Sequence, residues 1–312
     1  MEIINYNGWK NSLYLSNSLI DLIITTDVGP RIIRLGYKGK RNIFKEYKDM
    51  LGKVGGDAWR IYGGHRLWHA PETYPRTYFP DNSIIKVEQH NDVIRLISPT
   101  ELTTGIIKEI DIQLFPDSPK IKVTHRFHNT NLWRVELSLW AISCMAPDGE
   151  AIIPLPIRTT AFDQNNPGPT NSITLWPYTD MADQRFTWGT QYIIVKQDPK
   201  NGKHLKIGVK VPDGWISYAS NDYLFIKRFS YCGSENYPDI GSNVEVFTND
   251  DMLELETLSP LESLSPNSTM EYVEYWFLFN EVPFPKNEED IGRDVLPRVR
   301  TTTIQELFKE NQ

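Results

Sequence analysis

The sequence of 312 residues has few cysteines, no long hydrophobic run and no excess of basic residues. Its two cysteines are too few for a disulfide framework, and Cys144 lies in an apolar segment typical of a buried free thiol. The sequence has no stretch of roughly 18 apolar residues and no basic segment followed by an apolar run at its start, so it predicts neither a membrane span nor a secretory signal. We therefore expect a cytoplasmic protein without a membrane partner.

The charge is mildly acidic, with a formal net charge of −7 at pH 7 and no long block of one sign. A general nucleic-acid-binding protein needs a basic face to neutralise phosphates, so this class is disfavoured. The acidic balance mainly indicates solubility. We expect no nucleic-acid partner, and the sequence does not indicate an oligomeric state.

Aromatic residues and prolines are frequent, at 12% and 21 residues, and helix signals are scarce. Aromatic and β-branched residues favour strands, and proline favours turns. Apolar residues alternate with polar ones at 119–128, as in a half-buried strand. Roughly 16 to 20 short strands of this kind predict an all-β fold, a large antiparallel sandwich forming one domain over residues 1–312. A capping box at Thr303 and Glu306 predicts a short helix near 303–311.

The segment Gly63–Glu72 contains two histidines, an arginine, a tryptophan and a glutamate within ten residues. Its two leading glycines permit a sharp turn or a close approach to a ligand, and Pro71 disfavours helix, so we expect a shaped loop. His65, His69 and Glu72 could in principle form a metal site, but this signal is weak and we expect no metal. The remaining readings are a ligand-facing loop and histidines that hydrogen-bond to backbone.

Other candidate ligand-binding residues lie in the middle of the chain. His125 is on the apolar face of a predicted strand, where it is either a satisfied core histidine or part of a cleft lining. Trp140 could pack in the core or stack on the apolar face of a sugar ring. Asp180 and Arg185 lie in a polar loop between aromatic residues, which suits either hydroxyl recognition or a surface ion pair.

Two glutamates mark a late predicted strand. Glu254 and Glu256 occupy alternate positions and therefore the same face. Like charges side by side are costly without a partner, so an arginine, a histidine or a ligand is expected nearby, unless the strand is an exposed edge. A buried glutamate there could have a raised pKa and act as a base near neutral pH.

Together these motifs resemble the DUF4380 family, which is related to galactose mutarotases. The resemblance extends from about Trp9 to Phe279, and it implies a galactose mutarotase-like β-supersandwich. The segments that carry it are Asp27–Ile33, Gly63–Glu72, Tyr237–Glu245, Glu254–Leu261 and Leu264–Pro266.

Mutarotases interconvert the anomers of a free aldose: a base removes the proton of the anomeric hydroxyl and an acid protonates the ring oxygen. The resemblance implies that Glu256 is the base. The family's acid is a histidine on a strand similar to Leu137–Ser143, which has no histidine here. The acid would then be His65, His69 or His125, with His65 or His125 facing Glu256 across a sugar-sized concave cleft.

The sequence leaves the type of function open. It fits an aldose epimerase-like enzyme without a cofactor, a carbohydrate-binding protein that kept the cleft but not the reaction, or, less well, a carbohydrate lyase. The partner in each case is a small-molecule sugar or sugar derivative. Arg31 and Arg66 would bind sugar hydroxyls or a charged substituent. The candidate sugar-binding residues are Arg31, Arg66, His69, Trp140, Asp180, Arg185 and Glu254.

Overall fold

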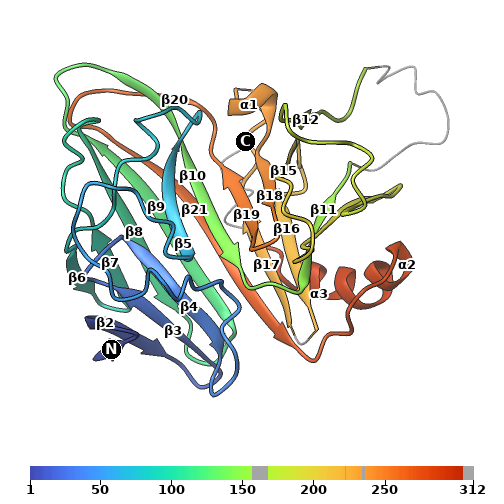
Figure 1. Ribbon diagram of the computed structural model, residues 1–312, viewed down its shortest axis with the longest axis horizontal. Helices are drawn as coiled ribbons and strands as arrows, with labels where there is room; N and C mark the ends of the chain where they lie inside the picture. The colour runs from blue at the N-terminus through green and yellow to red at the C-terminus, as the bar shows by residue number, and fades with distance from the viewer. Residues whose placement is uncertain (157–167, 222, 234–235, 305–312) are drawn as a thin grey trace.

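The computed structural model describes residues 1–156, 168–221, 223–233 and 236–304. Two large antiparallel sheets pack face to face (Figure 1), which confirms the all-β prediction. The first sheet has 11 strands. In spatial order they are β1 (Glu2–Tyr6), β2 (Trp9–Ser16), β3 (Ile20–Thr25), β4 (Arg31–Tyr37), β5 (Gly64–Ala70), β10 (Val135–Met145), β19 (Leu253–Leu258), β18 (Val244–Thr248), β15 (Leu205–Val209) and β12 (Ile173–Leu175), with β20 (Glu262–Leu264) paired to β10.

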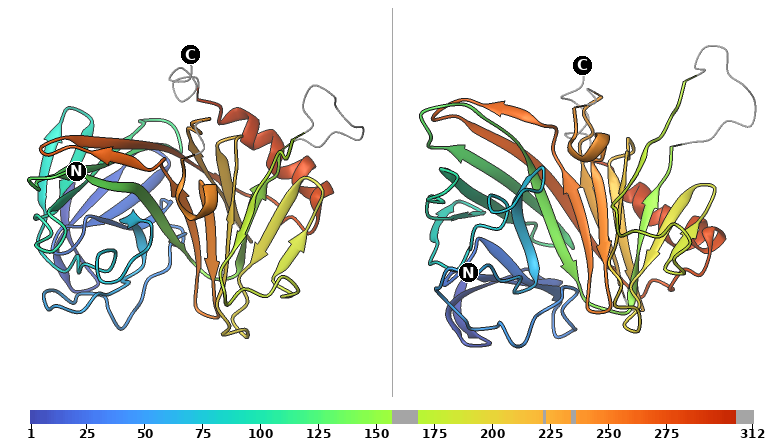
Figure 2. Two further views of the ribbon diagram at one scale, coloured as in Figure 1. Left: turned by 90° about the horizontal axis from the view of Figure 1, so that it is seen from above. Right: turned by 45° about the horizontal axis from the view of Figure 1, so that its top comes forward.

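The second sheet has 10 strands and packs against the first, and the view from above in Figure 2 shows the two layers side by side. Its strands, in spatial order, are β13 (Phe186–Trp188), β14 (Tyr192–Lys196), β11 (Gly149–Pro154), β16 (Trp215–Ser220), β17 (Tyr223–Phe229), β21 (Thr269–Asn280), β9 (Lys120–Asn129), β8 (Ile106–Leu114), β7 (Val93–Ile97) and β6 (Lys86–His90).

The main core lies between the two sheets and is built from alternate residues of their strands. Leu139 and Ala141 of β10 and Leu255 of β19 belong to one apolar cluster with Phe225 and Trp276 of the second sheet. Because strand side chains alternate between faces, the intervening residues of β10 and β19 point away from this core. We call that side of the 11-stranded sheet its outer face.

The helical segments are short. After the four-residue α1 (Pro238–Gly241), a continuous segment comprises α2 (Glu288–Asp290), the π-helical η1 (Ile291–Val295) and α3 (Leu296–Thr301). Apolar residues of this segment cover β11, β14, β16 and β17 on the side away from the main core. Within the described part of the chain, no helix is both long and apolar enough to cross a membrane.

The expected helix near 303–311 is not seen where it can be checked. Thr303 and Ile304 are not helical, and residues 305–311 lie outside the described part of the chain. The helical segment instead begins earlier, at Asn287, whose side chain accepts a hydrogen bond from the backbone N–H of Asp290. This is an N-cap that satisfies an otherwise unpaired donor of the first turn.

The segment predicted as a loop around His65 is strand β5, and this is the main correction to the sequence analysis. β5 pairs with β4 and along its whole length with β10. The two glycines do provide the expected close approach, but immediately before and at the start of the strand. A Cβ on Gly64, whose φ is +69°, would lie 2.3 Å from the carbonyl oxygen of Ile32. Tertiary pairing therefore overrides the local loop signal.

Candidate active site on the outer face of the large sheet

Strand alternation divides the residues of β5 between the two faces of the sheet. Leu67 belongs to the core between the sheets, whereas Trp68 belongs to a separate outer cluster with Trp140 and Ile142. Arg66 has the same parity as Trp68 and lies on the outer face. The strand register continues this row across the sheet: Arg66 lies opposite Ile142, Ile142 opposite Glu256, and Glu256 opposite Glu245.

Glu256 is the centre of a buried polar cluster on the outer face. The Nε1–H of Trp140 donates to its Oε2 at 2.8 Å, and the Nζ of Lys206 lies 3.2 Å from the same oxygen. Lys206 Nζ is also 2.7 Å from Oε2 of Glu245 on the neighbouring strand. Glu256 is 1% exposed and Glu245 is fully buried. We refer to Trp140, Lys206, Glu245 and Glu256 as the outer-face cluster.

The cluster perturbs the protonation of its members. Burial raises the pKa of Glu256, and it raises that of Glu245 well above its ordinary value, although Lys206 opposes both shifts. Burial disfavours the charge of Lys206, but the two carboxylates outweigh it and raise the lysine pKa. The lysine therefore stays charged, while the two coupled carboxyl groups hold a proton more readily than usual.

A second ion pair adjoins the cluster. Arg66 Nη1 lies 2.8 Å from Oε1 of Glu254, and both side chains are buried. The guanidinium carbon of Arg66 lies 4.4 Å from the ring centre of Trp68. The two glutamates predicted to share a strand face thus do so, and each has a cationic partner, as the cost of placing like charges side by side requires.

Aromatic side chains surround these charges. The ring of Trp68 lies 5.2 Å from that of Trp59 and 5.0 Å from that of Tyr78, and the tyrosine hydroxyl donates to Glu72. Trp176 lies 4.6 Å from the ammonium group of Lys206. Flat apolar rings beside hydrogen-bonding groups are the combination that a sugar ring needs, since it has an apolar face and polar edges.

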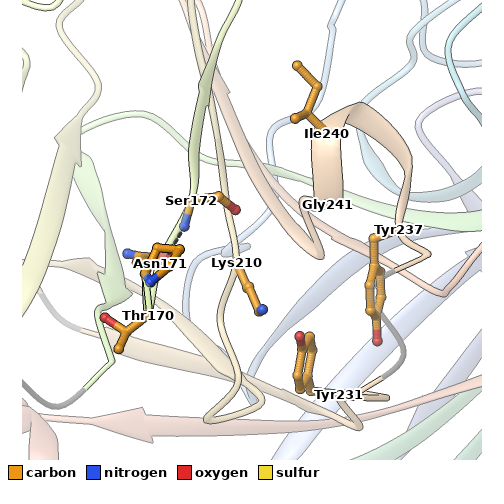
Figure 3. Close-up of a pocket in the computed structure, with 9 residues that line it drawn as sticks. Thr170, Asn171, Ser172, Lys210, Tyr231, Tyr237, Ile240 and Gly241 are labelled. Atoms are coloured by element: carbon orange, nitrogen blue, oxygen red, sulfur yellow. Dashed lines mark hydrogen bonds between the residues drawn. The ribbon is translucent and has the colours of Figure 1, made fainter. Parts of the chain in front are cut away.

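A hollow of about 400 Å³ (Figure 3) is lined by residues that include Asn171, Ser172, Lys210, Tyr231 and Tyr237, and none of its lining residues belongs to the outer-face cluster. Lys210 has the same parity as Lys206 along β15 and its continuation, so it points to the same side of the sheet. The rings of Tyr231 and Tyr237 stack at 5.5 Å. The hollow therefore lies on the same side of the sheet as the cluster, along β15 from Lys206.

The histidines predicted to face Glu256 lie on the other side of the sheet. His65 and His125 are fully buried between the two sheets, where their Nε2 atoms are 2.8 Å apart. His125 Nδ1 lies 3.3 Å from the carbonyl oxygen of Tyr272, and His65 Nδ1 lies 2.9 Å from the hydroxyl of Ser143. The prediction that His65 or His125 faces Glu256 across a cleft is therefore wrong, because the first sheet lies between these histidines and Glu256.

These contacts define the hydrogens of the two histidines. The carbonyl of Tyr272 can only accept a hydrogen bond, so we assign the proton of neutral His125 to Nδ1. Its Nε2 then accepts from the Nε2–H of His65. The Nδ1 of His65 in turn accepts from the hydroxyl of Ser143. Both rings are neutral in this arrangement. Burial lowers the pKa of His125 to about 4 and that of His65 well below its ordinary value. The pair ties the two sheets together.

His65, His125 and Glu274 form the one group of potential metal ligands within 4.8 Å among the described residues. Two nitrogens bound to one tetrahedral zinc would be separated by about 3.3 Å, whereas these are at hydrogen-bonding distance. Glu274 already accepts from Thr257 and Trp276. The geometry fits a hydrogen-bond network better than a metal centre.

His69 and Arg31 are also held in structural contacts. His69 shares the inner parity of His65, and its Nε2 lies 3.1 Å from Glu101. Arg31 lies opposite Arg66 in the register of β4 and β5, but its guanidinium donates to the carbonyls of Ile61 and Gly63 and to Asp81. Arg31 therefore holds the chain that leads into β5.

Asp180 stabilises its own loop, whereas Arg185 also donates to the carbonyls of Asn201 and Thr248. Asp180 accepts from the backbone of Ala182, and the buried Arg185 forms two hydrogen bonds with the carboxylate of Asp183. Of the predicted site residues, Arg66, Trp140, Glu254 and Glu256 lie together on the outer face. Lys206 and Glu245, which the sequence did not single out as site residues, join them there. Their signal was a single charged residue between two buried apolar ones, but only the register shows that the two strands are neighbours.

Neither a family model nor a curated protein matches the sequence, but solved structures match its fold. A candidate aldose 1-epimerase from Klebsiella pneumoniae subsp. pneumoniae is 10% identical, with a TM-score of 0.60, covering 97% of this chain and 87% of that one. A galactose mutarotase-like protein from Lactobacillus casei is 9% identical, with a TM-score of 0.54, covering 86% and 100%. Slr1438 from Synechocystis is 13% identical, with a TM-score of 0.57, covering 90% and 100%. The chain therefore has a galactose mutarotase-like fold, as predicted, while membership of the DUF4380 family stays a prediction.

Proposed function

We propose that the outer face of the 11-stranded sheet binds a free sugar, and that Glu256 and Glu245 interconvert its anomers by acid–base catalysis. The observation that carries the proposal is the pairing of these two buried carboxyl groups, in register on neighbouring strands, around one lysine. The mutarotase-like fold is consistent with a sugar substrate, and the aromatic and cationic groups beside the pair suit its recognition.

The reaction needs one base and one acid close together. Removing the proton of the anomeric hydroxyl and protonating the ring oxygen opens the ring, and reclosure after rotation gives the other anomer. Both oxygens are bonded to the same carbon, so the acid and the base can be neighbours. When two coupled carboxyl groups hold one proton between them, the ionised group can act as base and the protonated group as acid. Lys206, which contacts both, keeps the shared negative charge acceptable in a buried site.

This proposal assigns the acid differently from the sequence analysis. Glu245, rather than His65 or His125, would supply the proton, because it lies on the same face as Glu256. Arg66 and Glu254 would orient hydroxyl groups, and the rings of Trp59, Trp68 and Tyr78 would contact the apolar side of the sugar.

The test is anomer exchange of a panel of free aldoses, followed by polarimetry and by magnetisation-exchange NMR. We expect the wild-type protein to accelerate exchange of at least one aldose, and Glu256→Gln and Glu245→Gln each to lower kcat by about 100-fold or more, since each removes a proton-transfer group. Glu262→Gln is the matched control, because Glu262 is exposed on β20. Wild-type protein that leaves every aldose at its spontaneous rate contradicts the proposal.

The second candidate is a carbohydrate-binding protein without catalysis. It is favoured by the contacts of Glu256, whose Oε2 is engaged by both Trp140 and Lys206. This candidate predicts that a sugar binds, with changed tryptophan fluorescence, while its anomer exchange stays at the spontaneous rate.

A further inference from the structure

A second buried lysine lies on the inner side of the sheet, beneath the strands that carry the outer-face cluster. Lys227 of β17 is fully buried, and its Nζ lies 3.2 Å from each of three oxygens. Two of these are the backbone carbonyls of Ala141 and Leu255, and the third is Oε1 of Glu274. A side chain of the second sheet thus binds the backbone of both β10 and β19 in the first sheet.

Glu274 completes the connection to β19. Its carboxylate accepts from the hydroxyl of Thr257 and, at 2.8 Å, from Nε1–H of Trp276. Leu255 and Thr257 are the residues immediately before and after Glu256. The Lys227–Glu274 pair therefore holds β19 on both sides of Glu256, and it holds β10 next to Trp140, the indole that donates to Glu256.

Stability alone does not explain this arrangement. A buried ion pair loses hydration that its own attraction often fails to repay, and apolar replacement of both partners is frequently tolerated. Burial lowers the pKa of Lys227, although Glu274 opposes the shift. A large apolar core surrounds the pair and could close over it. What the pair uniquely provides is directional contact to the peptide groups that flank Glu256.

We propose that Lys227 and Glu274 are positioning residues that fix Glu256 and Trp140 in the geometry of the outer-face cluster. The kinetic part of this proposal rests on the proposed function; the structural part does not. Small displacements of a catalytic group are costly, so a rigid support beneath the strand has a direct chemical use. Neither Lys227 nor Glu274 touches the outer face, so neither is a catalytic residue.

The test is a charge-free double variant, Lys227→Met/Glu274→Met, read by NMR of the Trp140 indole N–H. The resonance is assigned by its loss in Trp140→Phe. In the wild type we expect its chemical shift to change with pH as the Glu256 carboxyl, which accepts its hydrogen bond, takes up a proton. Glu256→Gln should abolish this pH-dependent change. In the folded double variant we expect this pH-dependent change to disappear or to occur at a different pH. We also expect the chemical shift of the Trp140 N–H to move toward that of a free indole. An unchanged resonance with an unchanged pH dependence in the folded double variant overturns the proposal.

A matched control removes another buried ion pair. Lys108 Nζ lies 2.6 Å from Oε1 of Glu101, and both side chains are nearly as buried as those of Lys227 and Glu274. Within the described part of the chain, neither forms a hydrogen bond or ion pair with β10 or β19. Lys108→Met/Glu101→Met should leave the Trp140 resonance unchanged. If the first double variant does not fold, Thr257→Val keeps both charges and removes one contact; it should shift the Trp140 resonance, and an unchanged resonance there also counts against the proposal.

Kinetics separate this proposal from the proposed function. If wild-type protein accelerates anomer exchange of an aldose, the Lys227→Met/Glu274→Met variant should lower kcat at least 10-fold and change KM less than 3-fold. Changes of about this size are expected when Glu256 loses its alignment but the residues that contact the sugar are kept. If wild-type protein exchanges no aldose, the proposed function fails, and the NMR experiment still decides whether the pair positions Glu256.

Discussion

At the scale of single residues, the alternation of side chains between the two faces of a strand determines which residues can contact one another. Arg66 and His65 are neighbours in sequence, yet one joins Glu254 on the outer face and the other joins His125 between the sheets. The sequence shows both as candidate site residues, because residue type alone does not reveal a face. Because Gly64–Ala70 is a strand rather than a loop, the two side chains point to opposite faces of the sheet.

The buried histidine pair makes stability depend on pH. His125 has a folded-state pKa of about 4, whereas an unfolded histidine has about 6.5. The unfolded chain therefore takes up a proton first as pH falls, and the contribution of His125, present above pH 6.5, is lost progressively down to pH 4. The full loss corresponds to about 3 kcal/mol.

Urea unfolding between pH 7.5 and 4.5 measures this contribution. Glu245 and Glu256, whose pKa values are raised, act in the opposite direction, so the comparison is made between variants. His125→Gln should show a smaller loss of stability on acidification than the wild type. His90→Gln, which replaces an exposed histidine, should follow the wild type. Equal pH slopes for wild type and His125→Gln would contradict the neutral, buried assignment.

At the scale of elements, most strands were predictable and β5 was not. Alternation at 119–128 corresponds to β9, and the buried run 253–258 to β19, because their side chains follow the two-residue period. β5 contains two histidines and is bounded by glycine and proline, so its local signals favour a loop. The helical segment after Asn287 was missed although Ile291, Val295 and Val299 recur at helical spacing, because Gly292 and Pro297 weaken its local helix signal.

The start of β5 offers a test of close backbone packing. Gly64 and Gly39 both have φ of +69°, but a Cβ on Gly64 would meet Ile32 and Ile33, whereas one on Gly39 would meet nothing within 4 Å. Gly39→Ala should cost about 1 kcal/mol, the conformational penalty alone. Gly64→Ala should cost about 3 kcal/mol or more, because backbone atoms must also move. Urea denaturation measures both, and equal costs would refute the close approach.

At the scale of the whole molecule, the sheet order assembles a site from distant parts of the chain. Arg66, Trp140, Lys206, Glu245 and Glu256 lie on five different strands that are neighbours in the first sheet. The fold class could be predicted from strand patterns, and the resemblance to mutarotase relatives indicated Glu256. The partnership of Lys206 with Glu245 and Glu256 could not be predicted, since strand order and register depend on the packing of the entire sheet.

The metal question also belongs to the whole molecule. Hydrogen bonds account for the contacts of His65, His125 and Glu274, so we expect no bound metal there. A chelator shifts the melting temperature appreciably only if it removes a metal bound to the folded state. We therefore expect the melting temperature to change by less than about 1 °C when a chelator is added. Scanning calorimetry with and without EDTA, combined with elemental analysis of the purified protein, makes the measurement. A drop of several degrees together with stoichiometric zinc would identify a metal centre instead.

The ammonium of Lys206 lies 4.4 Å from the ring of Trp140 and 4.6 Å from that of Trp176. Each indole is thereby restrained before any guest molecule arrives, so little side-chain freedom is left to lose on association. A sugar should accordingly dock with a small entropic penalty. Most of its heat-capacity change should come from water released by the partly exposed ring of Trp176, and little from reordering of the protein.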